Sequence, residues 1–391
     1  MTALAQAVTL HDLSLDQLAE LLAGWGQPRY RAGQVWDWLY KKLAASPAEM
    51  TDLPKALRER LAAETRGDPL ERVYEQRSSD GQTVKWLFRL PDGLTIETVL
   101  MLYDDVSGST RERRTVCIST QAGCAMGCVF CATGQAGLAR NLTAGEIVAQ
   151  VLAAARALAN GKLQTANSTS TTGDPLSAIS HLTNVVVMGM GEPMANYEQT
   201  WAALRTLTDP EAFGLGARHI TVSTVGLPQG IRRMAAEPLQ INLAVSLHAP
   251  NDTLRARLVP INHRYPLSEV LEAVRDYIAG AHRRVTFEYA LMDRINDTPA
   301  LARELVALLK PLRSPTGGAM CHVNLIPLNP VAESPYQPST PEHAAGFQTL
   351  LEQSGIPATL RMRRGIDIDA GCGQLRRRVD SDGALITLVE R

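Results

Sequence analysis

The sequence predicts an α/β protein whose parallel-strand core, either a barrel or a doubly wound sheet, follows a region of helices and a small antiparallel sheet. After about residue 115, strand-like and helix-like segments alternate over roughly 250 residues. The strands are rich in valine, isoleucine and leucine, which is typical of strands buried in a parallel sheet. With 391 residues, of which 45% are hydrophobic, the chain can bury a sizeable core in two or three domains. This composition excludes a chain that is disordered throughout.

Three helices and a hairpin are expected in the first hundred residues. Ser14 can cap a first helix whose leucines share one face. A second helix is expected over residues 30–42, where the aromatic side chains suit core packing better than a binding surface. The third helix follows Pro54, which favours a first helical turn. Residues 83–90 and 94–103 alternate around Pro-Asp-Gly, which predicts a hairpin.

The core is expected to contain seven strand-like segments, separated mostly by helices. The strands are expected at 116–120, 184–190, 219–224, 241–247, 284–291, 322–328 and 358–362, with helices at 144–159, 267–280 and 299–310. A polar stretch at 161–181 interrupts this pattern and predicts a surface loop.

Charge and hydropathy exclude several classes of protein. The net charge is −1, so the chain cannot hold nucleic acid by overall charge and would need local patches. Candidate patches, which are equally compatible with solvated surface arginines, are Arg111, Arg113 and Arg114, and Arg361, Arg363, Arg364, Arg376, Arg377 and Arg378. No apolar run is long enough to span a membrane, and the N-terminus lacks a secretory pattern. We therefore expect a cytoplasmic protein.

Six cysteines, at positions 117, 124, 128, 131, 321 and 372, carry the strongest chemical signal. Cys124, Cys128 and Cys131 follow a predicted strand and place three thiolates within eight residues. Three such ligands can hold three irons of a [4Fe–4S] cluster and leave the fourth iron open. Structural zinc needs a fourth ligand, commonly from a second pair, and no second pair is evident. The sequence therefore predicts an iron–sulfur cluster.

The C-x3-C-x2-C spacing resembles the radical S-adenosylmethionine (SAM) superfamily. The surrounding segment, CISTQAGCAMGCVFCATGQAGLARNLTAGEIVAQV, is similar to the RlmN/Cfr family of RNA adenine methyltransferases. The similarity continues through VVVMGMGEPMANY, ITVSTVGLP, VSLHAPND, LVPIN, VTFEYALM, NLIPLNP and RRGIDIDAGCGQL.

This resemblance implies a partial (β/α)6 radical SAM barrel with a small N-terminal helical domain and a β-hairpin extension. The expected divisions are a helical RNA-binding accessory domain (1–70), the hairpin extension (71–109), the barrel (110–366) and a C-terminal segment (367–391). The implied cofactors are one [4Fe–4S] cluster and SAM, of which two molecules are consumed per methylation. We also expect a monomer that does not associate with membranes and receives electrons from flavodoxin or ferredoxin.

The implied reaction is methylation of C2 of an adenine in the peptidyl-transferase region of 23S rRNA, and of the adenine 3′ of the anticodon in tRNA. Cys372 matches the family cysteine that becomes methylated, and Cys117 the one that later forms a transient disulfide with it. Glu97 matches the proton acceptor, although periodicity alone favours a solvent-facing position on the hairpin. Each thiol alone would be interpreted as buried, as we still interpret Cys321.

The residues expected to contact SAM follow predicted strands, where α/β folds place ligands. Gly191 allows a close backbone approach, and Glu192 can pair with the ammonium group of SAM. The matching positions further along the chain are Ser223, Ser246, Leu247, His248 and Asn329. A metal-ligand interpretation of His248 is rejected, because no other histidine or carboxylate has matching spacing.

Three alternatives remain. The sister activity would methylate C8 of the same rRNA adenine with the same cysteines. A non-catalytic RNA-binding factor could retain the cluster for structure, although binding alone needs neither Cys117, Cys372 nor Glu97. A radical SAM enzyme acting on a small molecule is disfavoured by the N-terminal domain and the arginine clusters.

Overall fold

The computed structural model describes residues 8–103, 113–159, 182–314, 316–329, 335–361 and 368. The predicted loop at 161–181, Cys372, Arg111, Arg363, Arg364 and the arginines at 376–378 lie outside these residues. No helix in the described part of the chain has the length and hydropathy needed to cross a bilayer.

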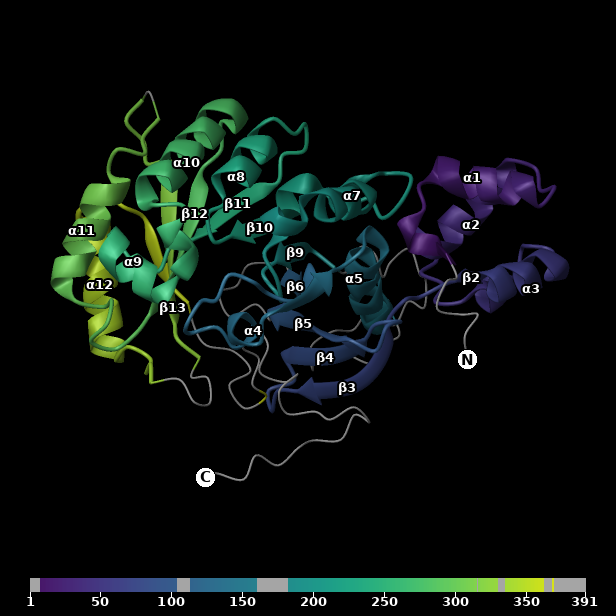
Figure 1. Ribbon diagram of the computed structural model, residues 1–391, viewed down its shortest axis with the longest axis horizontal. Helices are drawn as coiled ribbons and strands as arrows, with labels where there is room; N and C mark the ends of the chain where they lie inside the picture. Colours follow the sequence, from purple (N-terminus) through teal and green to yellow (C-terminus); the bar gives the residue numbers. More distant parts are fainter. Residues whose placement is uncertain are drawn as a thin grey trace.

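Seven parallel strands form the barrel wall, and all seven expected strands are present (Figure 1). They are β6 (Arg113–Cys117), β9 (Asn184–Val187), β10 (Ile220–Thr224), β11 (Asn242–Ser246), β12 (Val285–Leu291), β13 (Cys321–Pro327) and β14 (Ala358–Leu360). Each pairs in parallel with the next in this order. The fold is therefore the expected α/β partial barrel, with seven strands where the resemblance implies a (β/α)6 barrel.

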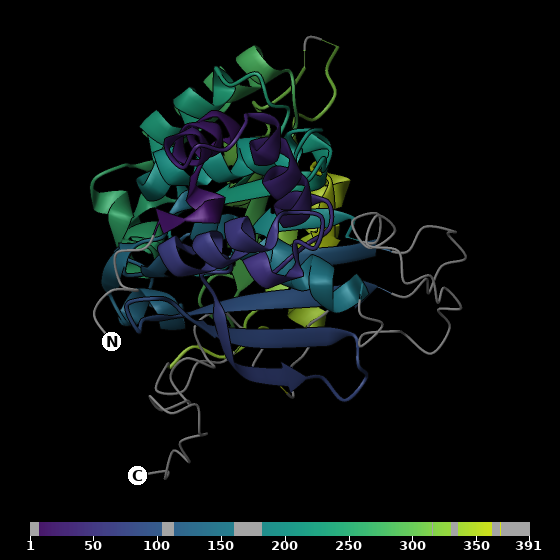
Figure 2. The same ribbon diagram turned by 90° about the vertical axis from the view of Figure 1, so that its right-hand side faces the viewer.

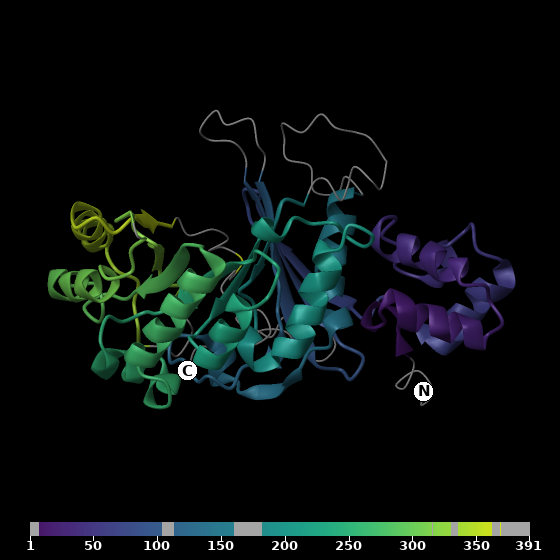
Figure 3. The same cartoon turned by 90° about the horizontal axis from the view of Figure 1, so that it is seen from above.

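Helices cover the outer side of these strands (Figures 1 and 3). They are α5 (Ala144–Ala159), α7 (Tyr197–Thr208), α8 (Pro228–Ala235), α9 (Asp252–Leu258), α10 (Leu267–Ala281), α11 (Pro299–Leu309) and α12 (Pro341–Gln353). Threonine followed by proline begins both α11 and α12. In each case the threonine side chain accepts a backbone N–H and the proline occupies the first turn. The cap explains why α11 begins where the sequence predicts, whereas α12 is a helix that the sequence analysis did not predict.

The hairpin continues the barrel sheet, which corrects the expectation of a separate small sheet. β3 (Glu71–Arg77), β4 (Thr83–Arg89) and β5 (Thr95–Tyr103) pair antiparallel, and β5 then pairs antiparallel with β6. One ten-stranded sheet results, with β3 and β14 at its two edges in the described part of the chain. Because β4 and β5 are interior strands, most of their side chains are buried.

The N-terminal helices form a separate unit at one end of the molecule (Figures 1 to 3). They are α1 (Leu15–Gly24), α2 (Tyr30–Tyr40) and α3 (Lys55–Glu64). Ser14 forms the expected cap and completes a capping box with Gln17. Trp36 and Tyr40 are buried against each other, with ring centroids 4.5 Å apart. These two aromatic residues therefore belong to the core.

Candidate functional site

A cavity of about 780 Å³ lies inside the barrel and brings together four of the predicted site residues, namely Glu97, Cys117, His248 and Asn329. Strand alternation places these side chains on one face of the sheet. Val99 of β5 lies opposite Cys117 of β6, and Cys117 lies opposite Val186 of β9. Glu97, two residues before Val99, shares that face. Residues from opposite ends of the sequence therefore converge on one space.

The three clustered cysteines lie on a loop between two short paired strands, β7 (Gln121–Gly123) and β8 (Leu138–Asn141). Gly123 has φ +97°, and a Cβ there would lie 2.0 Å from the carbonyl oxygen of Gly137. Only glycine fits this close approach. Cys124 and Cys128 are buried, whereas Cys131 is partly exposed at the start of α4 (Ala132–Gln135). The loop is thus held in a defined conformation.

The chemistry of this donor set fits an iron–sulfur cluster. Burial raises the pKa of Cys124 to about 11, and it raises the pKa of Cys128 further. Thiols in such a site become thiolates when a metal compensates their charge. Three thiolates sharing one tetrahedral zinc ion would lie about 3.8 Å apart. Within the described residues, only Asp293, Asp297 and His343 form a group of three potential metal ligands (His, Cys, Asp or Glu) whose donor atoms all lie within 4.8 Å of one another. The three cysteines of the loop are therefore farther apart than one zinc ion requires.

Gly191 and Glu192 lie in the loop that follows β9, next to the cysteine loop. Gly191 has φ +108°, and a Cβ there would lie 2.6 Å from the Gln121 side chain, so glycine is required. Glu192 is buried, and its carboxylate accepts the backbone N–H groups of Met194 at 3.0 Å and Val225 at 2.8 Å. Burial nevertheless raises the pKa of Glu192 to about 7. The side chain is therefore fixed in position and titrates near neutral pH.

The other predicted SAM contacts lie at or just after the ends of β10, β11 and β13. The hydroxyl oxygens of Ser223 and Ser246 are 3.3 Å apart, and Leu247 is fully buried. His248 has φ +60°, and its Nδ1 accepts the backbone N–H of Ala290 at 3.0 Å. Burial lowers the pKa of His248 to about 3, so the imidazole is neutral. It packs edge-on against Phe130 of the cysteine loop, with centroids 4.8 Å apart.

Glu97 is buried, which corrects the solvent-facing position that periodicity favours. Its side chain is 2% exposed and forms an ion pair with Lys85, with Nζ 3.0 Å from Oε2. The difference arises because β5 lies between β4 and β6 and does not face solvent at the edge of a hairpin. Burial raises the pKa of the Cys117 thiol to about 12. Cys321 is a buried core thiol, as expected.

Several polar residues of the site were missed by the sequence analysis. Glu288 and Asn324 also line the cavity, and Asn324 Nδ2 donates to Glu288 Oε1 at 2.9 Å. Both lie on apolar parallel strands. On such a strand, the sequence alone does not indicate whether a single polar side chain points into the barrel, because this depends on the strand register. The sequence did contain a sign of the position of Lys85. This residue shares one face of its strand with Thr83 and Leu87, and that strand pairs with the one that contains Glu97.

Arg255 connects the loops that follow β10 and β11 with the segment after α9 that contains Asn262. Its side chain is fully buried, and Nε donates to the carbonyl oxygen of Leu247 at 3.1 Å. Its Nη2 atom donates to the carbonyl oxygen of Val225, and Nη1 donates to Asn262 Oδ1 at 2.8 Å. A guanidinium with its donors in a rigid fork suits such multiple acceptors. This side chain therefore holds together the loops that carry Glu192's partner Val225 and the Ser246–His248 segment.

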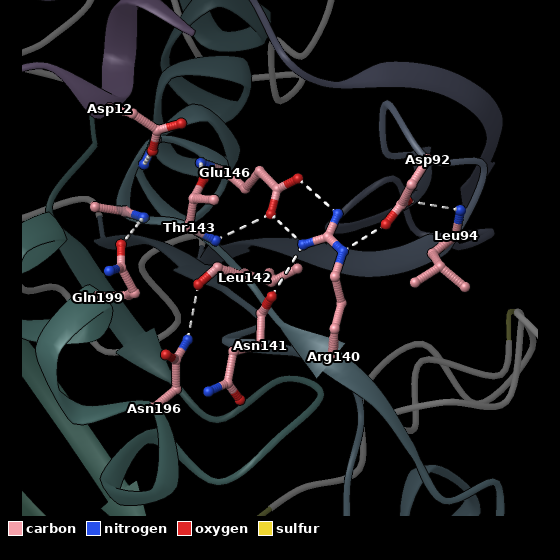
Figure 4. Close-up of polar contacts among 12 residues, drawn as sticks. Asp12, Asp92, Leu94, Arg140, Asn141, Leu142, Thr143, Glu146, Asn196 and Gln199 are labelled. Carbon is pink, nitrogen blue, oxygen red and sulfur yellow. Dashed lines mark hydrogen bonds and ion pairs between the residues drawn. The ribbon is translucent and has the colours of Figure 1, made fainter. Parts of the chain in front are cut away.

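A second arginine, Arg140, anchors the strand that follows the cysteine loop (Figure 4). It donates to both carboxylate oxygens of Glu146 on α5, at 2.7 and 2.8 Å, and its Nε donates to Asp92 in the hairpin turn. Nearby, Asn196 Nδ2 donates to the carbonyl oxygen of Leu142 at 2.9 Å. The N-terminal region attaches here as well, because Asp12 accepts the N–H of Gly145. Three parts of the chain thus meet behind the cysteine loop.

Comparisons with known proteins find relatives that match almost the whole chain. A family model described as "Ribosomal RNA large subunit methyltransferase N-terminal domain" matches residues 8–66. A protein of Roseiflexus castenholzii named "Probable dual-specificity RNA methyltransferase RlmN" is 50% identical over 386 residues, covering 94% of this chain and 95% of that protein. "Dual-specificity RNA methyltransferase RlmN 1" of Myxococcus xanthus is 46% identical and covers 96% of both. The crystal structure of a radical SAM methyltransferase from Sphaerobacter thermophilus superposes with a TM-score of 0.84 at 51% identity, covering 94% of this chain and 99% of that one.

Proposed function

The chain belongs to the RlmN family of radical SAM RNA methyltransferases, and on this premise we propose that it methylates C2 of an adenine in the peptidyl-transferase region of 23S rRNA. The adenine 3′ of the anticodon in tRNA is the second proposed substrate. The observation that carries this proposal is the single cavity that Glu97 and Cys117 line together. A protein that only binds RNA has no use for a buried carboxylate and a thiol in one cavity.

Cys124, Cys128 and Cys131 would hold the cluster, and SAM would lie beside it against Gly191, Glu192, Ser223, Ser246, Leu247, His248 and Asn329. When bound, these groups supply one-electron chemistry and the methyl group. Gly191 lets the backbone approach the ligand, and the Glu192 carboxylate pairs with its ammonium group. The neutral His248 and Phe130 pack against each other and line this end of the cavity. We expect flavodoxin or ferredoxin as electron donor and a monomeric, cytoplasmic enzyme.

Three side chains carry the transfer to RNA. The thiolate of Cys372 accepts the methyl group, and the same sulfur then connects the methyl carbon to C2 of adenine. The carboxylate of Glu97 accepts the C2 proton as a general base. Cys117 attacks the sulfur of Cys372 to release the methylated RNA, forming a disulfide. Burial raises the pKa of Cys117 to about 12, so this thiol needs help from neighbouring charges to react.

The test is anaerobic reconstitution with iron and sulfide, followed by addition of SAM and an rRNA fragment. The adenine carries deuterium at C2 or at C8, and nucleosides are analysed by mass spectrometry. We expect loss of the C2 deuterium with gain of a methyl group. Loss of the C8 deuterium would identify the sister activity. An intact cluster with bound RNA and no methylation would identify a binding factor.

Two thiol variants test the order of steps. Cys372→Ala should yield neither methylated protein nor methylated RNA, although its cluster assembles. Cys117→Ala should still methylate Cys372 and attack RNA, and then stop as a covalent protein–RNA adduct that survives denaturing electrophoresis. The adduct should map to the peptide that contains Cys372. Normal turnover by Cys117→Ala would contradict the paired-thiol mechanism.

A further inference from the structure

The wall of the cavity contains a buried ion pair that the mechanism above uses only in part. Lys85 of β4 has a fully buried side chain, and its Nζ lies 3.0 Å from Glu97 Oε2. Glu97 lines the cavity, whereas Lys85 is not among the lining residues and so lies behind it. An ammonium group buried this completely carries a large desolvation cost. Two apolar side chains of the same volume would fill this wall without that cost.

The strand register relates this pair to Cys117. Lys85 lies opposite Val99, and Val99 lies opposite Cys117, so the three form one row across β4, β5 and β6. Glu97 is on the same face, two residues from Val99, and is therefore a diagonal neighbour of both Lys85 and Cys117. Two opposite charges thus lie at comparable distances from one thiol.

The charges that act on Cys117 come from two elements packed against β6. Lys85 on β4 is positive and Glu97 on β5 is negative. On the other side, β9 and the residues after it contribute Val186, Met188 and Gly189 to the cavity lining, and the backbone of Met188 forms a hydrogen bond with the thiol. The other charged or titratable lining residues are His248, Glu288 and Arg361, together with Tyr103 on β5 and Arg113 on β6 itself. Lys85 and Glu97 are the near pair.

We propose that Lys85 is a positioning residue that holds the Glu97 carboxylate at the cavity wall and makes the reactivity of Cys117 depend on whether Glu97 carries a proton. This inference rests on the proposed function for the source of that proton, which is C2 of adenine. The C2–H bond breaks, the proton forms an O–H bond on Glu97, and Lys85 keeps its charge throughout. The pair thereby changes from neutral overall to positive beside Cys117.

The electrostatics of the thiol support this coupling. Burial is the largest influence on the pKa of Cys117 and raises it, and a hydrogen bond with the backbone of Met188 lowers it. Of the two nearby charges, Lys85 lowers that pKa and Glu97 raises it. Protonation of Glu97 removes its opposition to Lys85, and the thiolate becomes more favourable. The releasing thiol would therefore be activated only after the C2 proton has left. This order prevents Cys117 from attacking the methylated Cys372 before the adenine is ready.

The test measures alkylation of Cys117 by iodoacetamide on the full-length protein, quantified by peptide mass spectrometry between pH 8 and pH 9. Below its pKa, the alkylation rate of a thiol follows its thiolate fraction. Glu97→Gln mimics the protonated carboxyl and should raise the rate about tenfold. Lys85→Met should lower it about tenfold, as expected for one charge about 10 Å away at an effective dielectric constant of about 20. Lys85→Arg should preserve the parental rate.

Controls keep this result interpretable. The double variant Lys85→Met with Glu97→Gln removes both charges and leaves neither buried ion unpaired, so it should fold and return the rate towards the parent value. Lys55→Met and Glu59→Gln, in an exposed ion pair on α3, should leave the rate unchanged. The proposal would be overturned if the folded Glu97→Gln variant, like Lys85→Arg, reacted at the parental rate. Shifts of the same sign for Glu97→Gln and Lys85→Met would also overturn it.

The assay uses neither RNA nor SAM, and this separates the inference from the proposed function. Opposite shifts together with no RNA methylation would leave the charge coupling intact and contradict the function. C2 methylation by the parent with no change in thiol reactivity among the variants would support the proposed function and contradict the charge coupling.

Discussion

Two buried carboxylates line the cavity, and their surroundings differ. Glu97, on the antiparallel strand β5, has an ammonium group 3.0 Å away. Glu288, on the parallel strand β12, receives a neutral amide N–H from Asn324 at 2.9 Å. Burial raises the pKa of Glu288, against smaller opposing effects of Asn324 and Arg361. The same side chain is thus compensated by a cation on one wall and by an amide on the other.

Because of this difference, one cavity can support two kinds of hydrogen bonding. An ion-paired carboxylate can accept a proton, whereas burial favours the neutral carboxyl form, which can donate a hydrogen bond. Asn324 adds a buried oxygen, Oδ1, for which no hydrogen-bond partner is found within the described residues. We therefore expect the antiparallel wall to perform proton transfer and the parallel wall to bind a polar group.

The largest effect should come from the cysteine loop above both walls. Cys128→Ala removes a cluster ligand, so bound iron, SAM cleavage and methylation of both Cys372 and RNA should fall below detection. Cys321→Ala, at a buried core thiol, is the matched control and should retain iron and activity with a modest loss of stability. Iron analysis and nucleoside mass spectrometry measure both variants. Iron retained in Cys128→Ala would contradict the assignment of the loop.

The second effect distinguishes the two walls directly. Glu97→Gln should lower RNA methylation by about 10²- to 10⁴-fold, which is typical for loss of a general base. Methylation of Cys372 should continue, because that step does not use Glu97. Single-turnover assays of methylated peptide and methylated nucleoside separate the two steps. Equal losses for Glu97→Gln and Glu288→Gln would remove the distinction between the walls.

A smaller effect should appear in the pH dependence of the parallel wall. If Glu288 donates a hydrogen bond, parental substrate binding weakens as pH rises through its raised pKa and the proton is lost. Glu288→Gln keeps a neutral N–H donor, so its binding should be within about tenfold of the parent at pH 6 and should not weaken in this way. RNA binding measured from pH 6 to pH 9 tests this. A parallel decline in Glu288→Gln would assign the effect to another group.

The smallest effect concerns stability outside both walls. His11 is buried, Nδ1 lies 2.9 Å from the carbonyl oxygen of Gly67, and burial lowers its pKa to about 4. The unfolded chain binds a proton near pH 6.5 while the folded protein does not, so stability is full above that pH and is lost as pH falls towards 4. The loss should be at most about 3 kcal/mol. Urea unfolding at pH 7 and pH 5 should show it in the parent and not in His11→Gln, whereas His343→Gln, at an exposed histidine, should behave as the parent.

The sequence predicted local features well and long-range pairing less well. Helix α5 has the predicted bounds, and the Ser14 cap and the closely spaced cysteines appear where local pattern places them. Glu97 differs because its burial depends on the pairing of β5 with β6, and the alternating pattern within one strand does not encode which strands pair. The Glu288–Asn324 contact depends on the register of β12 and β13, which hydrophobic runs do not encode. The position of Cys372 lies outside the described residues.

Within the described part of the chain the sheet has two edges, β3 and β14, and this has a topological consequence for a polymeric substrate. A closed ring of strands admits a small molecule through either end, but an RNA nucleotide continues into chain on both its 5′ and 3′ sides. Such a nucleotide reaches a pocket only when it is swung out of its stack, with both flanking phosphates left outside. An open barrel wall lets the looped RNA enter and leave from the side, so that no end of the RNA has to pass through the barrel. An incomplete barrel therefore suits modification at an internal position of a long RNA.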